Sequence, residues 1–132
     1  QNPHGEAGVV AIFCDRLLNG LAPKINGDGE QTRDYIFVGD IVRANLMALE
    51  SSNSGIYNVG TGVETSVNEI AESLLNLSGS KISLETAQGL DYEQRRSCLD
   101  YKKIEASMGW APKVSLKEGL VETYEFFKKA TF

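Results

Sequence analysis

The chain has 132 residues, of which 42% are hydrophobic and 23% charged, and its formal net charge is -5. This length and composition are typical of one soluble globular domain. An acidic chain without a segregated basic face is poorly suited to nucleic acid. No apolar run approaches the roughly 20 residues that span a bilayer, so we expect no membrane contact and a cytoplasmic location.

Cysteine and histidine are scarce. Cys14 and Cys98 lack metal-ligand spacing, and we predict two reduced thiols. His4 is the single histidine, which argues against a histidine-based metal site and a Ser-His-Asp triad. The chain begins at Gln1 within a loop-like segment, and we expect it to be a piece of a longer protein.

The first elements predicted are a helix and a short extended segment. Apolar residues recur at helical spacing over residues 9–18, and the Asn-Gly pair at residues 19–20 predicts the helix end. Residues 23–26 predict an extended segment. A turn should follow at residues 27–29, which contain two glycines.

Three strands are predicted further along. Residues 35–38 are aromatic and β-branched, which favours a strand, and Asp40 should then cap a helix over residues 41–49. Residues 55–59 predict a buried strand. Residues 81–85 alternate weakly and predict a short one.

Capping boxes mark the starts of two later helices. Ser66 and Ser115 each precede a glutamate by three positions; they predict helices over residues 67–77 and from residue 116 to about residue 129. A shorter helix should end at Met108. Strands alternate with helices, so the predicted class is α/β.

No segment carries a complete catalytic pattern. Residues 60–62, Gly-Thr-Gly, stand where a dinucleotide-binding turn would stand, but the third glycine and the acidic partner are missing. Tyr124 and Lys128 have acid/base spacing, yet the amphipathic terminal helix favours a packing role. We predict no catalytic residue and no metal site in this chain.

Four segments, in order along the chain, resemble those of extended short-chain dehydrogenase/reductases, the NAD-dependent epimerase/dehydratase family. They read NPHGEAGVVAIF at residues 2–13, PKINGDGEQTRDYIFVGD at residues 23–40, YNVGTG at residues 57–62, and RRSCLD at residues 95–100 with MGWAP after it. They cover nearly the whole chain at the family's spacing. UDP-glucose 4-epimerase is the branch that they resemble most.

The resemblance implies that residues 1–132 form the C-terminal substrate-binding domain, a small mixed α/β domain lacking most of the Rossmann sheet. The family's Gly-rich NAD loop and Tyr-x-x-x-Lys pair would lie upstream of Gln1. NAD would therefore act in the complete enzyme, which interconverts UDP-glucose and UDP-galactose. We expect this chain alone to bind no NAD and to be inactive.

The resemblance also assigns contacts to a UDP-sugar, through Gly8, Val9, Lys24, Ile25, Asn26, Arg33 and Glu93. The start of a helix offers free N–H groups to a pyrophosphate, although a small residue at Gly8 is equally suited to easing helix entry. The guanidinium of Arg33 can meet phosphate oxygens bidentately; its alternative is a surface ion pair with Asp34 or Asp28. The segment from Lys24 to Asn26 matches backbone that contacts uracil, and Glu93 matches the acid that bonds the ribose.

One position departs from the family. Leu90 stands where a second phosphate-binding arginine is usual. Losing a charge-assisted contact costs on the order of 1.5–3 kcal/mol, or about one to two decades in affinity. Arg95 or Arg96 could take its place if the loop shifts.

Other functions fit the same segments. A dehydratase or decarboxylase acting on a UDP- or dTDP-sugar shares this half of the fold. A stand-alone nucleotide-sugar-binding module and an inactive remnant are the non-enzymatic alternatives. A bare strand edge at residues 55–59 predicts self-association or a homodimer.

Overall fold

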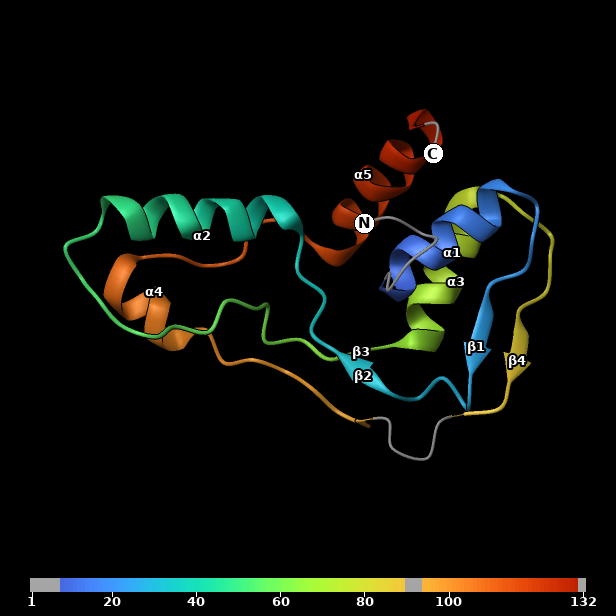
Figure 1. Cartoon of the computed structure of the whole chain (residues 1–132), viewed down its shortest axis with the longest axis horizontal. Coiled ribbons are helices and arrows are strands. Elements are labelled where there is room, and N and C mark those ends of the chain that lie inside the picture. The colour runs from blue at the N-terminus through green and yellow to red at the C-terminus, as the bar shows by residue number, and fades with distance from the viewer. Residues whose placement is uncertain (1–7, 90–93, 131–132) are drawn as a thin grey trace. The chain divides into compact units, whose positions relative to one another are not determined.

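The computed structural model describes residues 8–89 and 94–130. It divides into two compact units: unit 1 comprises Gln1–Gln31, Ser66–Arg95 and Leu120–Phe132, and unit 2 comprises Thr32–Thr65 and Arg96–Gly119. The elements in chain order (Figure 1) are α1 (Val9–Leu18), β1 (Lys24–Asn26), β2 (Thr32–Arg33), α2 (Val38–Glu50), β3 (Thr65–Ser66), α3 (Val67–Ser78), β4 (Glu85–Ala87), α4 (Lys102–Met108) and α5 (Leu116–Lys129). This mixed α/β content matches the predicted class.

In unit 1, α1 packs against α3, and β1 pairs with β4 in parallel (Figure 1). The helix α1 has the predicted bounds, and it ends where Asn19 and the left-handed Gly20 (φ 69°) stop it. The unit buries apolar side chains from both helices and from β1: Ala11, Phe13, Cys14, Leu17, Ile25, Val67, Ile70, Ala71 and Leu74.

The predicted capping box at the start of α3 is confirmed. The Ser66 hydroxyl accepts from the Glu69 N–H at 3.1 Å, and the Glu69 carboxylate accepts from the Ser66 N–H at 2.7 Å. Gly79, with φ 66°, ends the helix. Two N–H groups that a helix start leaves unpaired are thereby satisfied.

In unit 2, the core forms around Trp110, which is fully buried with Ala44 and Ile104. Its indole N–H donates to the carbonyl of Asp40 at 3.1 Å. Tyr101 lies edge-on to its ring, with the centroids 5.9 Å apart. Trp110 therefore anchors this core directly after Gly109, the left-handed residue that ends α4 where the sequence predicts a helix end.

The predicted strand at residues 35–38 is wrong. Phe37 is extended (φ -70°, ψ 137°) but serves as the N-cap residue of α2, which already begins at Val38. Asp40 is therefore not the N-cap but the third residue of the helix, and its side chain is buried. Its carboxylate does not cap the start of α2. It accepts hydrogen bonds from the N–H groups of Lys113 and Val114 instead.

The predicted buried strand at residues 55–59 is also wrong. Ile56 is 88% exposed, and the sheets of the described residues contain only the pairs β1–β4 and β2–β3. A strand requires a neighbouring strand for its backbone groups, and this segment has none in the part of the chain that the structure describes. The other short strand lies later than predicted, at Glu85–Ala87 instead of residues 81–85.

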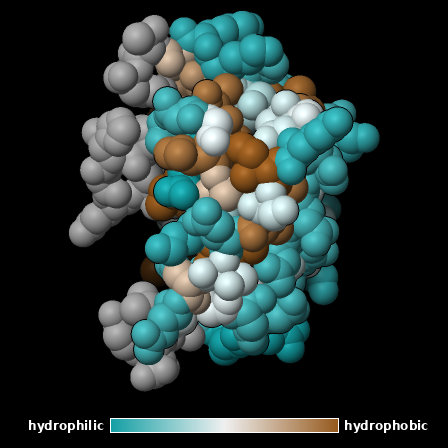
Figure 2. All heavy atoms as spheres, turned by 90° about the vertical axis from the view of Figure 1, so that its right-hand side faces the viewer, coloured by the Kyte–Doolittle hydropathy of each residue, from teal (hydrophilic) through white to brown (hydrophobic). Residues whose placement is uncertain are grey.

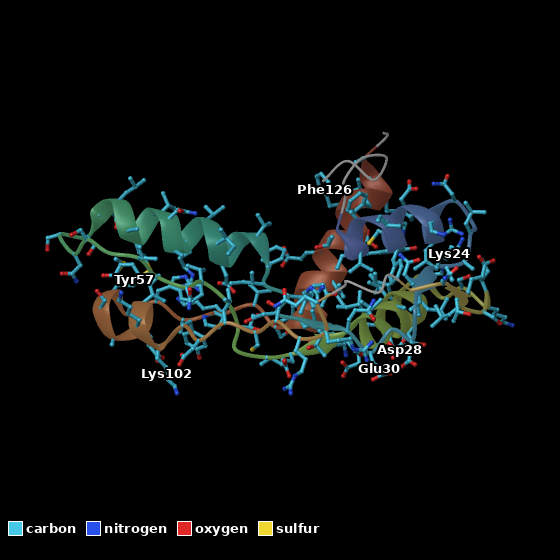
Figure 3. All side chains as sticks on the ribbon, turned by 60° about the horizontal axis from the view of Figure 1, so that its bottom comes forward. Lys24, Asp28, Glu30, Tyr57, Lys102 and Phe126 are labelled. Carbon is cyan, nitrogen blue, oxygen red and sulfur yellow. The ribbon has the colours of Figure 1, made fainter. Side chains whose placement is uncertain are left out.

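The last helix begins as predicted. The Glu118 carboxylate accepts from the Ser115 N–H at 3.0 Å, and the Ser115 hydroxyl accepts from the Glu118 N–H at 3.3 Å. Tyr124 and Phe127 on α5 are buried, which confirms a packing role for Tyr124, and burial raises its pKa. Phe126 is 58% exposed (Figure 3).

The surface beside β1 and β4 is largely hydrophilic, with an apolar band near its middle (Figure 2). Partly exposed apolar side chains of unit 1 include Leu18 and Leu21. None of the described helices has both the length and the apolar character needed to cross a membrane.

Candidate functional site

The first amide groups of α1 lack partners among the residues that the structure describes. Gly8 is exposed and extended, no side chain caps the helix, and its first turn holds no acidic residue. The Gly8 carbonyl accepts from the Ala11 N–H at 3.0 Å. The N–H groups of Val9 and Val10 have no hydrogen-bond partner within residues 8–89 and 94–130. This end of α1 therefore favours an anion, through its N–H donors and the positive end of the helix dipole.

The edge of β1 that faces away from β4 presents backbone polar groups. The Pro23 carbonyl accepts from the Glu85 N–H at 3.0 Å, and the Gly27 N–H donates to the Ala87 carbonyl at 2.9 Å. Alternate residues of a parallel strand bond the same neighbour, so the backbone of Ile25 faces β4.

The backbone groups of Lys24 and Asn26 consequently face the opposite edge. Their side chains are exposed, whereas that of Ile25 is buried. The carbonyl of Asn26 accepts from the side-chain amide of Gln31 at 3.3 Å. The N–H and carbonyl of Lys24 and the N–H of Asn26 are thus the groups that a flat polar ring could meet there.

The turn after β1 is held by side chains from elsewhere in unit 1. Asn68 donates to the Asp28 carbonyl at 2.9 Å and to the Glu30 carboxylate at 2.7 Å. Arg95 meets the Asp28 carboxylate with two bonds, of 2.8 and 3.1 Å, and its hydrogen bond lowers the pKa of Asp28. Asp28 and Glu30 lie close together on this turn (Figure 3). Arg95, not Arg33, is the ion-pair partner of Asp28.

Arg33 ends β2 in unit 2 and is half-buried. Its Nη1 donates to the carbonyl of Thr32 at 2.8 Å. The second predicted alternative, an ion pair with Asp34, competes with several other donors to that carboxylate, described next. Arg33 belongs to unit 2, whereas Gly8, Val9 and the residues of β1 belong to unit 1.

The Asp34 carboxylate binds the Gly-Thr-Gly turn. It accepts from the N–H groups of Thr61 at 2.8 Å, Gly62 at 3.0 Å and Leu99 at 3.2 Å. Burial alone would raise the pKa of Asp34, but the hydrogen bonds from Thr61, Gly62 and Leu99 outweigh it and lower that pKa. Because two amides of the turn serve an internal carboxylate, residues 60–62 do not fit a dinucleotide pyrophosphate. They form a turn held by Asp34 instead.

Arg96 is engaged by Glu64. Its Nε and Nη2 donate to the two carboxylate oxygens at 3.0 and 2.6 Å, and this contact lowers the pKa of Glu64. The Thr32 hydroxyl donates to the same carboxylate at 3.3 Å. Both arginines that the sequence offers in place of Leu90 are therefore held by carboxylates in this structure.

Two predicted positions, Leu90 and Glu93, lie outside the described residues. Within residues 8–89 and 94–130, no group of three or more His, Cys, Asp or Glu side chains could hold a metal ion. Both cysteines are free thiols, Cys14 buried and Cys98 exposed. Sequence reasoning missed the roles of Asp34 and Glu64. No local signal could have found them, because their partners lie far along the chain.

Comparison with known proteins decides the family. The family described as GDP-mannose 4,6 dehydratase matches residues 4–123. The chain belongs to this family of nucleotide-sugar epimerases and dehydratases, the extended short-chain dehydrogenase/reductases. A UDP-glucose 4-epimerase of Mycolicibacterium smegmatis is 46% identical over 129 residues, which are 97% of this chain and 41% of that protein. A dTDP-glucose 4,6-dehydratase of an Actinoplanes species is 36% identical over 125 residues, 91% of this chain and 38% of that protein.

Solved structures give the same result. The structure of the UDP-glucose 4-epimerase of Thermotoga maritima with UDP-glucose superposes on this chain with a TM-score of 0.93 at 46% identity. The superposed part is 98% of this chain and 42% of the Thermotoga maritima chain. The Thermus thermophilus UDP-glucose 4-epimerase, a complex with NAD, gives a TM-score of 0.87 at 40% identity over 99% of this chain and 43% of its own. The chain thus spans about two-fifths of the length of these relatives.

Proposed function

We propose that the chain is the UDP-sugar-binding portion of an NAD-dependent UDP-glucose 4-epimerase. The observation that carries the proposal is its likeness to the Thermotoga maritima enzyme with UDP-glucose, at 46% identity over 98% of this chain. The accessible donors of unit 1 support the same ligand. In the complete enzyme, NAD would accept hydride from the sugar and return it to the other face. We assign no catalytic role to any residue of this chain.

In unit 1 the diphosphate would lie at the start of α1 and the uracil along the outer edge of β1. The N–H of Val9, next to Gly8, suits phosphate oxygens. Uracil presents carbonyl acceptors on either side of one imino N–H donor, and the backbone of Lys24 and Asn26 offers the complementary donors and acceptor. Ile25 supports this edge from the buried side. These contacts depend on backbone groups, so they tolerate changes of the exposed side chains.

Arg33 is our proposed cation for the diphosphate, and Glu93 our proposed partner of the ribose hydroxyls. A planar guanidinium forms charge-assisted bonds with phosphate that are about twice as strong as neutral ones. The half-buried position of Arg33 and its bond to the Thr32 carbonyl restrict its motion, which limits the entropy lost on binding.

A dehydratase acting on a dTDP-sugar is the second candidate. The 36% identity with the Actinoplanes dehydratase supports it. Calorimetric titrations with UDP, dTDP and CDP separate the two. The epimerase proposal predicts the strongest binding by UDP and weaker binding by CDP, because cytosine lacks the imino proton. Stronger binding by dTDP would favour the dehydratase. No heat and no thermal shift with UDP or UDP-glucose at millimolar concentration would refute nucleotide-sugar binding altogether.

Self-association through residues 55–59 is a further part of the proposal. This segment has no strand partner in the described residues, and Ile56 is 88% exposed. An exposed apolar side chain of this kind is suited to contact with another copy of the chain. Light scattering should give a mass above the monomer that falls towards the monomer on dilution, and Ile56→Lys should favour the monomer. A monomeric mass for the wild type at high concentration contradicts this part alone.

A further inference from the structure

The backbone carbonyl of Thr32 accepts two hydrogen bonds, one of them from Arg33, the residue that we propose to bind the diphosphate. It accepts from Nη1 of Arg33 at 2.8 Å and from the N–H of Ser97 at 3.2 Å. The direction of this carbonyl therefore helps to fix the direction of the guanidinium. Whatever restrains Thr32 also restrains Arg33.

Thr32 is restrained through its side chain by an ion pair. Its hydroxyl donates to Glu64 Oε1 at 3.3 Å, and Arg96 Nε donates to the same oxygen at 3.0 Å. Arg96 Nη2 bonds the other oxygen at 2.6 Å. Bidentate arginine–carboxylate pairs have a defined geometry. Because Ser97 follows Arg96 in the chain, the pair also fixes the segment whose N–H bonds the Thr32 carbonyl.

We propose that Glu64 and Arg96 are positioning residues that fix Arg33 for contact with the diphosphate, acting through Thr32. The inference rests on the proposed function for the identity of the ligand. The claim that Glu64 and Arg96 restrain Arg33 does not depend on that function. Arg96 then has a role that differs from replacing the arginine absent at Leu90. Its charge is neutralised by Glu64, and it acts on the phosphate only through Arg33.

Direct phosphate binding by Arg96 is the competing role, and the two predict opposite results for one substitution. Glu64→Gln removes the charge that holds Arg96. If Arg96 bound phosphate itself, this release would strengthen UDP binding. If Glu64 and Arg96 position Arg33, the substitution loosens Thr32 and weakens UDP binding, by about twofold to tenfold for coupled neighbours.

The experiment measures UDP and uridine affinities for the wild type, Glu64→Gln, Arg96→Ala, and each change combined with Arg33→Ala. We expect both single changes to weaken UDP binding and to leave uridine binding within about twofold. Their effect should vanish in the Arg33→Ala background. Lys102→Ala is the control, because it also removes a cation of unit 2. The Lys102 side chain is 85% exposed, and its ion pair with Asp100 is long, at 4.0 Å. This variant should bind UDP and uridine as the wild type does. Stronger UDP binding by Glu64→Gln, or an Arg96→Ala loss that persists without Arg33, would overturn the inference.

A ligand-free measurement separates this inference from the proposed function. Nitrogen-15 relaxation of the Arg33 Nε–H group, assigned with Arg33→Lys, reports its order directly. We expect that order to fall in Glu64→Gln and Arg96→Ala and to be unchanged in Lys102→Ala. If UDP fails to bind the wild type but the Arg33 Nε–H group loses order in Glu64→Gln and Arg96→Ala, the proposed function fails and the positioning role stands. Unchanged order in both variants refutes the positioning role whatever UDP does.

Discussion

Asp40 is a buried carboxylate that bonds three groups of unit 2. Its side chain is 2% exposed and accepts from the N–H groups of Lys113 at 2.9 Å and Val114 at 3.0 Å. Arg43 Nη2 donates to the other oxygen at 2.5 Å and to the carbonyl of Ala111 at 2.6 Å. One carboxylate thus joins α2 to the segment that leads into α5.

Asp40→Asn keeps the size of the side chain and removes its charge. Breaking a buried ion pair costs roughly 3–5 kcal/mol when the remaining charge stays unpaired. Arg43 retains the Ala111 carbonyl and is 26% exposed, so solvent relieves part of that cost. The Asn oxygen can take the place of Oδ2 and keep both backbone donors, but its NH₂ group then faces Arg43 Nη2. That donor loses its acceptor, at about 1–3 kcal/mol. We expect a net loss of about 2–4 kcal/mol in the free energy of unfolding.

The stabilisation by Asp40 should depend on pH with a definite sign. Burial alone would raise the pKa of this carboxyl, but hydrogen bonds from Val114, Arg43 and Lys113 outweigh it and lower the pKa. A carboxyl whose folded-state pKa is below its unfolded value stabilises fully above the unfolded pKa, about 3.9. The contribution is lost as the pH falls through the folded-state pKa.

Urea denaturation at neutral pH, repeated towards pH 3, measures both effects. The difference between wild type and Asp40→Asn should be largest at neutral pH and should shrink in acid. Glu50→Gln is the control, because it changes an exposed charge on the same helix and should cost less than about 0.5 kcal/mol. If Asp40→Asn cost no more than Glu50→Gln, the assigned role of Asp40 would be refuted.

Three further predictions concern local features. Ser66→Ala removes the N-cap of α3 and should cost about 1 kcal/mol of unfolding free energy in urea denaturation; no change would contradict the capping box. Gly29→Ala should destabilise by about 1–3 kcal/mol more than Gly20→Ala, because both have positive φ but only at Gly29 would a Cβ overlap Asn68; equal losses would contradict this. Burial raises the pKa of the Cys14 thiol to about 12. Iodoacetamide at about pH 8 should therefore modify only the other, exposed cysteine of the native chain, and two modifications by intact mass without denaturant would refute the buried site.

The helices were predictable because their signals are local. The capping box at Ser66 lies within three residues of its partner, and Gly109 ends α4 by its own left-handed conformation, with φ 70°. Strands were less predictable: the extended segment at residues 23–26 contains β1, but a strand exists only when a distant segment pairs with it. Residues 35–38 and 55–59 have strand composition but no such pairing in the described residues.

The candidate site divides in the same way. Gly8 at a helix start and Lys24 in an extended segment follow from their neighbours in the chain, and the structure places them so. The hydrogen-bond partners of Asp34 and Glu64 do not follow from their neighbours in the chain. Asp34 accepts from an N–H 65 positions away, and Glu64 from an arginine 32 positions away. Only the folded chain brings these groups together.

The central claim is that this chain binds the UDP part of a nucleotide sugar, and an amide map of the chain titrated with UDP tests it most directly. The account predicts saturable chemical-shift changes at the N–H groups of Val9, Lys24 and Asn26, with smaller changes from CDP. Saturable binding that left all three amides unmoved, or no shifts at millimolar UDP, would contradict it.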